Sequence, residues 1–210
     1  MGHAVLISVT STTPPLGRYK HGARRGPRGY AFRVSLTEAE FAVLRQTIAS
    51  RGTTRMVLLP ITLLGWGSLT LLILFLGEFP VASLISLSIL VGGFEAIHAL
   101  HVGVERVGRY LQVHYEALPG GPRWETTVMA VGPALPGGGI DPLFSFVFVG
   151  ATFINLIPAL LPSPTTLELG VVGVVHLLFV IRIVRARGAA ARQRAVELES
   201  FRAILAKSNE

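Results

Sequence analysis

The sequence lacks cysteine entirely across its 210 residues. This absence excludes disulfide bridges, thiolate metal sites, iron–sulfur clusters and haem attached through cysteine. Charged residues are also scarce, at 15% of the chain, whereas a soluble domain has about a quarter. The His-Glu-x-x-His motif of zinc proteases and the Gly-x-Ser-x-Gly motif of serine hydrolases do not occur. The composition is therefore not that of a soluble domain, and none of these motifs points to an enzyme.

Long apolar stretches dominate what is present. Half of the residues are hydrophobic and the mean hydropathy is +0.57. Because a helix of about 20 residues crosses the hydrocarbon core of a bilayer, we expect four spans, near 56–76, 81–101, 143–161 and 167–184. The links 77–80 and 162–168 are short, so each joins two antiparallel neighbours. The sequence predicts an all-α integral membrane four-helix bundle, made of two antiparallel transmembrane hairpins with cytoplasmic helical extensions.

The basic residues predict the orientation of this bundle. All 19 Lys and Arg residues lie before the first span, in the middle connection, or at and beyond the end of the last span. The positive-inside rule places that side in the cytoplasm. We therefore expect a multi-pass protein of the cell inner membrane with cytoplasmic N- and C-termini. The net charge of +7 follows from this topology, so we expect the lipid bilayer, and no nucleic acid, as a partner.

The segments outside the spans differ in composition. Residues 1–34 are rich in Pro, Gly, Lys and Arg and predict a flexible basic arm, and 35–52 predicts an amphipathic helix that starts with capping-box spacing. The four-span domain covers 53–186. Its middle loop, 117–140, is so rich in Pro and Gly that we expect no regular structure there. Residues 187–210 predict a second cytoplasmic helix.

A polar stripe begins inside the second span and continues beyond it. Its members recur every three or four positions, which places them on about one third of a helix surface; they are Glu95, His98, His101, Glu105, Arg109, Gln112 and Glu116. A polar stripe that starts in lipid is costly unless it faces protein, water or an ion. The stripe therefore predicts a site.

Three kinds of chemistry suit this site. Glu95, His98, His101 and Glu105 have the spacing of ligands for a divalent metal ion. His98 with His176 of the fourth span offers a less favoured pair of axial ligands for haem b. Glu95 has no basic neighbour one turn away on its own helix, which suits a proton relay through the same Glu and His residues.

The function that we expect first is less specific. The stripe presents a polar face to a partner or to lipid, and the protein is an accessory or assembly subunit. In this interpretation the cytoplasmic part of the stripe, together with the neighbouring Arg106, contacts lipid headgroups or a partner; the residues are Arg106, Arg109, Gln112 and Glu116. Four spans are few for an independent transporter, so we also expect a homo-oligomer or a larger membrane complex.

Overall fold

The computed structural model describes residues 28–77, 79–117, 123–131 and 142–208. These residues are mostly helical and include no strand. Three helices are long: α1 (Arg28–Leu76), α2 (Ser83–His114) and α6 (Thr166–Ser208). The shorter elements are η1 (Pro80–Ala82), α3 (Trp124–Val131), α4 (Pro142–Ile154) and α5 (Ile157–Leu160). The all-helical prediction is confirmed.

Three helices in the described part of the chain are long and apolar enough to cross a membrane, within Glu38–Leu76, Pro80–His114 and Thr166–Lys207. The expected span near 143–161 is not one such helix. It consists of α4, about 20 Å long, and α5, separated by a turn at Asn155 and Leu156. Pro158 has no amide hydrogen for the Ile154 carbonyl, so the helix is interrupted there. A four-helix transmembrane bundle is therefore not confirmed, although the described residues include three helices that are long and apolar enough to cross a membrane.

Two boundaries that the sequence predicts between separate helices are absent from the structure. α1 is continuous from Arg28, so the helix expected over 35–52 and the first span form one element of about 74 Å. It begins inside the expected basic arm, of which residues 1–27 lie outside the described part. α6 likewise joins the fourth span to the C-terminal helix. Single glycines at Gly52 and Gly188 do not end these helices, because one glycine costs only about 1 kcal/mol.

The prediction of no regular structure over 117–140 is wrong for α3. Residues Trp124–Val131 contain no Pro or Gly, and the prolines and glycines of this connection lie on either side of them. A helix therefore fits between these breakers, and its first amides are bound by the carboxylate of Glu116, just beyond the end of α2. The remaining residues of the loop, 118–122 and 132–140, lie outside the described part.

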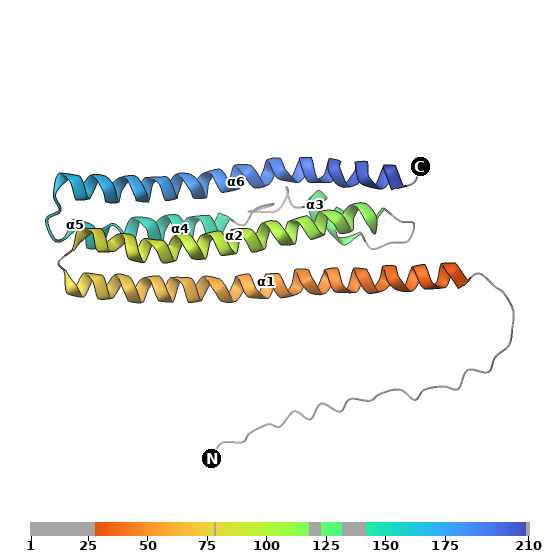
Figure 1. The fold of residues 1–210 in the computed structure, drawn as a ribbon, viewed down its shortest axis with the longest axis horizontal. Coiled ribbons are helices and arrows are strands. Elements are labelled where there is room, and N and C mark those ends of the chain that lie inside the picture. Colours follow the sequence, from red (N-terminus) through yellow and green to blue (C-terminus); the bar gives the residue numbers. More distant parts are fainter. Residues whose placement is uncertain (1–27, 78, 118–122, 132–141, 209–210) are drawn as a thin grey trace, which may run out of the picture.

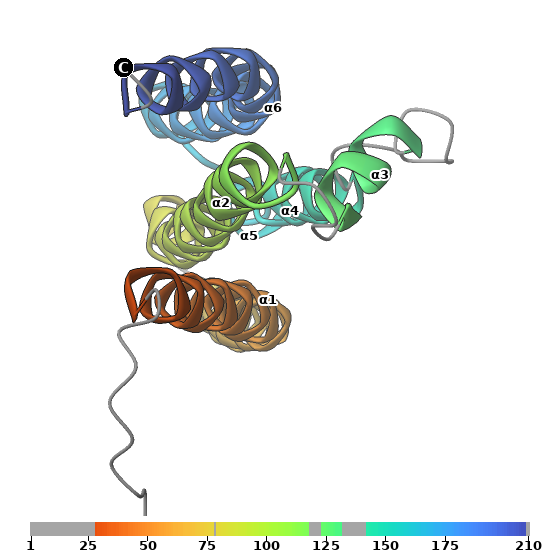
Figure 2. The same cartoon turned by 90° about the vertical axis from the view of Figure 1, so that its right-hand side faces the viewer.

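α2 is the central element of the molecule. Figures 1 and 2 show α1, α2 and α6 side by side with α2 in the middle, and α4 packed beside α2. α2 and α6 run in the same direction, opposite to α1 and α4 (Figure 1). The start of α1 and the end of α6 therefore lie at the same end of the molecule, together with most of its basic residues. We call this end the basic end.

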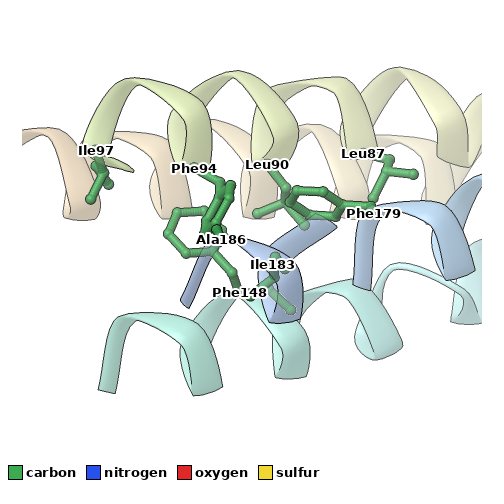
Figure 3. Packing of buried hydrophobic residues seen from close by; sticks show 9 residues of the cluster. Leu87, Leu90, Phe94, Ile97, Phe148, Phe179, Ile183 and Ala186 are labelled. Carbon is green, nitrogen blue, oxygen red and sulfur yellow. The ribbon is translucent and has the colours of Figure 1, made fainter. Parts of the chain in front are cut away.

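The apolar core lies where α2, α4 and α6 meet (Figure 3). Its buried members are Leu87, Leu90, Phe94 and Ile97 of α2, Phe148 and Ala151 of α4, and Phe179, Ile183 and Ala186 of α6. The Phe94 ring packs edge-on against Phe148 and Phe179, with centroids 5.4 and 5.8 Å away. Because lipid chains are as apolar as these side chains, close packing holds the helices together here, more than the hydrophobic effect.

Candidate functional site

The polar stripe of α2 contacts different elements along its length. Nearest the core, Glu95 pairs with Arg182 of α6 at 2.7 Å. Both side chains are about half exposed, Glu95 at 41% and Arg182 at 44%. By helix rise, Glu95 lies about 22 Å from Pro80 and Arg182 about 24 Å from Thr166, which is inside a hydrocarbon layer of about 30 Å. α2 has no Lys or Arg one turn from Glu95, and the cation that pairs with this carboxylate comes from another helix, α6.

His98 and His101 line a small cavity one turn further along α2. Its volume is about 60 Å³, and Arg55 of α1 is its other strongly polar residue. Most of the remaining wall is apolar and includes Phe94, Ile97, Phe148, Ile183 and Ala186 of the core (Figure 3). The rest of the wall is Phe144, Ser145 and Ala190.

Arg55 is held by two contacts at this cavity. Its Nη1 donates a hydrogen bond to His101 Nδ1 at 3.0 Å, because a guanidinium cannot accept one. Its guanidinium carbon lies 4.9 Å from the centre of the Phe144 ring, in cation–π contact. His101 Nε2 is 3.5 Å from the Glu105 carboxylate, an ion-pair distance that does not form a hydrogen bond.

Beyond the cavity, α2 and α6 are joined by an ion-pair cluster. Glu105 accepts from Arg109 at 3.1 Å and from Arg194 at 3.0 Å. Glu197 of α6 lies 2.6 Å from Arg109 and 3.0 Å from Arg106. Arg109 is only 5% exposed. Its two carboxylate partners offset the free-energy cost of burying its charge. The cluster fastens the parts of α2 and α6 that extend toward the basic end.

The pKa of Glu197 reflects these contacts. Burial acts to raise the pKa of this carboxyl, but hydrogen bonds from Arg109, Arg106 and Gln193 act in the opposite direction and outweigh it. The net pKa of Glu197 is therefore lowered, and the carboxylate stays charged at neutral pH.

The last residue of the stripe, Glu116, binds the start of α3. Its carboxylate accepts from the backbone amides of Glu125 and Thr126 at 2.6 and 2.7 Å, and from the Thr126 hydroxyl at 2.6 Å. These are amides that a helix cannot satisfy by itself. Glu125 in turn pairs with Arg45 of α1 at 3.3 Å. Burial raises the pKa of Glu125, Arg45 lowers it and the nearby Glu116 raises it.

The four residues that the sequence predicts to contact headgroups or a partner therefore differ in burial and in their contacts within the protein. Arg109 and Glu116 are buried and bound within the protein. Arg106 is more than half exposed, although it also pairs with Glu197. Gln112 lines an open cavity of about 400 Å³ beside Glu116 and Arg202.

The predicted metal site is not supported. Among the described residues, no group of three or more His, Asp or Glu side chains is arranged to hold a metal ion. The reason is that arginines occupy the candidate ligands: Arg182 binds Glu95, while Arg109 and Arg194 bind Glu105. The sequence spacing was suitable, but a metal ion would have to compete with these cations.

Both ring nitrogens of His176, the predicted haem ligand, form hydrogen bonds with other residues of the protein. Its Nδ1 lies 2.8 Å from the Val172 carbonyl and its Nε2 lies 3.0 Å from Asn155 Nδ2. Since a carbonyl only accepts and an amide nitrogen only donates, the neutral ring carries its proton on Nδ1 and uses both nitrogens. This geometry leaves neither nitrogen available as an axial ligand opposite His98.

Asn155 is the centre of a buried polar cluster whose role the sequence did not indicate. Its Oδ1 accepts from Trp66 at 2.9 Å and from Ser86 at 2.6 Å, and lies 3.4 Å from the Thr70 hydroxyl. Its Nδ2 donates to the Ser83 carbonyl at 2.9 Å as well as to His176. Asn155 thus links α1, α2 and α6 at the end of α4. Isolated polar residues in otherwise apolar spans were the available signal.

Comparisons of the chain with protein-family models, with curated proteins and with solved structures find no match.

Proposed function

We propose that the protein is an accessory or assembly subunit of an inner-membrane complex, and that it docks through one membrane-facing surface of α2. The observation that carries this proposal is the Glu95–Arg182 pair, which is about half exposed at a depth where lipid chains would surround it. Charged side chains within membrane spans almost always face protein or water. A second protein surface over this pair removes it from lipid.

The surface beside this pair suits close contact between helices. Four small, exposed residues of α2 lie on the same side as Glu95, within about 100° of the helix circumference: Ser88, Gly92, Ala96 and Ala99. A Cβ added at Gly92 would meet nothing within 4 Å. Small residues let two membrane helices approach closely and pack by van der Waals contact. We call Glu95, Arg182 and these four residues the docking face.

The occupant that best fits the docking face is a second copy of this chain. Glu95 and Arg182 lie side by side and at nearly the same depth, about 22 and 24 Å from the starts of their helices. A two-fold axis along the membrane normal therefore places Glu95 of one copy opposite Arg182 of the other. The surface is self-complementary, as the contact in a two-fold dimer must be.

Cysteine cross-linking in isolated membranes tests this proposal, because the chain has no cysteine of its own. The variant Ala96→Cys is expected to form a disulfide-linked dimer on mild oxidation. Leu72→Cys of α1, which is 52% exposed, is the control and should remain monomeric. Adding Glu95→Gln to Ala96→Cys should reduce the yield of dimer. Equal yields from Ala96→Cys and Leu72→Cys would contradict a specific docking face, and an adduct of a different mass would replace the second copy with another protein.

A further inference from the structure

At the cavity between Arg55, His98 and His101, two polar side-chain atoms lack a hydrogen-bond partner among the described residues. Arg55 Nε and His101 Nε2 are both buried, and neither has a hydrogen-bond partner in the part of the chain that the structure describes. Because Arg55 Nη1 donates to His101 Nδ1, the neutral ring carries its proton on Nε2. Both unsatisfied atoms are therefore donors, and a buried donor without an acceptor is unfavourable.

The charges around the cavity favour an anionic acceptor. Arg55 contributes a full positive charge to its wall. Glu105, the carboxylate closest to His101 in the ion-pair cluster, is bound by Arg109 and Arg194. Glu95, on the preceding turns of α2, is bound by Arg182. The two carboxylates that would repel an anion are thus each neutralised, while the Arg55 charge has only a neutral imidazole and an aromatic ring as its described contacts.

The position of the cavity indicates where such an acceptor comes from. By helix rise, Arg55 lies about 32 Å from the end of α1 at Leu76, and His101 about 32 Å from Pro80. The hydrocarbon layer is about 30 Å thick, so the cavity lies at its boundary on the basic end, at the level of lipid headgroups. Its wall combines these polar groups with the apolar side chains Phe94, Phe144, Phe148, Ile97 and Ile183.

The size of the cavity limits what enters it. A buried water needs about 10–15 Å³, so the 60 Å³ here accommodates one acidic group with its nearest carbon atoms and not a whole lipid. We propose that this cavity binds the acidic headgroup of a membrane amphiphile, a carboxylate or a phosphate monoester, whose oxygens accept from Arg55 Nε and His101 Nε2 while its chain remains in the bilayer. We call this the headgroup site.

Binding to the purified full chain in a mild non-ionic detergent tests the headgroup site, with native mass spectrometry to count bound molecules. Oleate and oleoyl lysophosphatidate are the acidic probes, and monooleoylglycerol is the neutral probe with the same chain. We expect one acidic amphiphile per chain at saturation and binding at least about tenfold weaker for the neutral probe, since hydrogen bonds to charged groups are the strong ones.

Three variants locate the binding. Arg55→Gln removes the charge and should weaken oleate binding about tenfold or more. Ala190→Leu fills the cavity from α6 while leaving Arg55 in place, and should weaken it similarly. Arg185→Gln, an exposed arginine of α6 outside the cavity wall, removes the same charge and should leave binding unchanged. If Arg55→Gln does not fold, Ala190→Leu decides the question.

Several outcomes overturn the proposal. Equal oleate binding by the wild type, Ala190→Leu and Arg185→Gln would show that the amphiphile lies elsewhere. Equal binding of monooleoylglycerol and oleate would show that the acidic group is not recognised. Displacement of oleate by acetate or inorganic phosphate at matched concentration would assign the site to a soluble anion and not to a lipid. The headgroup site does not depend on the docking face, because neither Arg55 nor Ala190 belongs to that face.

Discussion

Gly93 illustrates how closely the helices approach at a single residue. A Cβ at this position would overlap the Thr62 side chain of α1, at distances that real side chains do not show. Thr62 is itself buried and donates to its own helix at the Leu58 carbonyl, 2.8 Å away. The absence of a side chain at Gly93 therefore sets the spacing between α1 and α2 within the membrane part.

We predict that Gly93→Ala destabilises the protein by about 1–3 kcal/mol, the usual cost of overfilling a packed contact. Thermal unfolding in detergent would measure this. Gly67→Ala of α1 is the matched control, because a Cβ there meets nothing within 4 Å. Adding Thr62→Ala to Gly93→Ala should restore part of the loss. Equal melting temperatures for Gly93→Ala and Gly67→Ala would argue against the close contact.

Asn155 is a second residue whose role depends on side chains from other helices, in this case through hydrogen bonds. It is completely buried, and its amide satisfies partners from α1, α2 and α6 at once. In an apolar surrounding these partners have few alternatives. The cluster thus specifies one arrangement of the helices, a role that a buried polar network performs well when every member is satisfied.

We predict that Asn155→Leu lowers the free energy of unfolding by about 2–3 kcal/mol, the sum of several membrane hydrogen bonds of about 0.6 kcal/mol each. Ser200→Ala is the comparison, because Ser200 is exposed, lies outside the docking face and donates to the Val196 carbonyl of its own helix. It should change stability by less than about 0.5 kcal/mol. Denaturant titration in mixed micelles separates the two, and a loss in Asn155→Leu as small as that in Ser200→Ala would show that the cluster contributes little.

At the scale of elements, α2 contacts different helices at different positions along its length. Its apolar residues pack against α4 and α6, its charged residues bind α6, and Glu116, two residues beyond its end, binds α3. A surface ion pair contributes little, but Arg109 is buried between Glu105 and Glu197. Removing one partner of a buried charge is costly because the other charge is left without compensation.

We predict that Glu197→Gln destabilises the protein by about 2 kcal/mol at neutral pH, whereas the exposed Glu199→Gln does not. The pKa of Glu197 is lowered from its ordinary value of 4.5 in the folded protein. Its contribution is therefore present above about pH 4.5 and is lost as the pH falls below that value. The raised pKa of Glu125 has the opposite sign and offsets part of this loss.

Unfolding followed at several pH values between about 7 and 3 checks this prediction, because the expected loss lies below about pH 4.5. The wild type should lose stability toward acid pH, and Glu197→Gln should show a shallower decline because the titrating group is gone. Parallel pH profiles for the wild type and Glu197→Gln would show that other carboxyls determine the loss of stability at acid pH.

The candidate site was partly predictable at this scale. The three- and four-residue spacing places Glu105 and Arg109 on one side of α2, where they form an ion pair, because helical periodicity is a local property. Glu116 lies beyond the end of α2 at His114. Spacing could not reveal that Arg182, Arg194 and Arg55 come from other helices to bind the same residues. Arg55 in particular lies directly before the apolar block 56–76, where the sequence indicates only the topology.

At the scale of the whole molecule, the helix arrangement keeps the proposed docking face and the proposed headgroup site apart. α2 lies between α1 and α6, with α4 beside it (Figure 2). The small residues of the docking face lie on the part of α2 that these neighbours leave exposed. The headgroup site lies among α1, α2, α4 and α6. A dimer through the docking face would therefore leave the residues of the headgroup site outside the contact.

The sequence by itself determined the helical class, the apolar stretches of the three helices that are long and apolar enough to cross a membrane, and the clustering of basic residues, because hydropathy and charge are properties of short stretches of chain. Only the tertiary structure decided which charges meet, that the expected third span is interrupted after Ile154, and that the metal-like Glu and His residues are bound by arginines. The physical reason is that an ion pair between helices depends on distances across the bundle, and partners such as Glu95 and Arg182 are 87 residues apart in the chain.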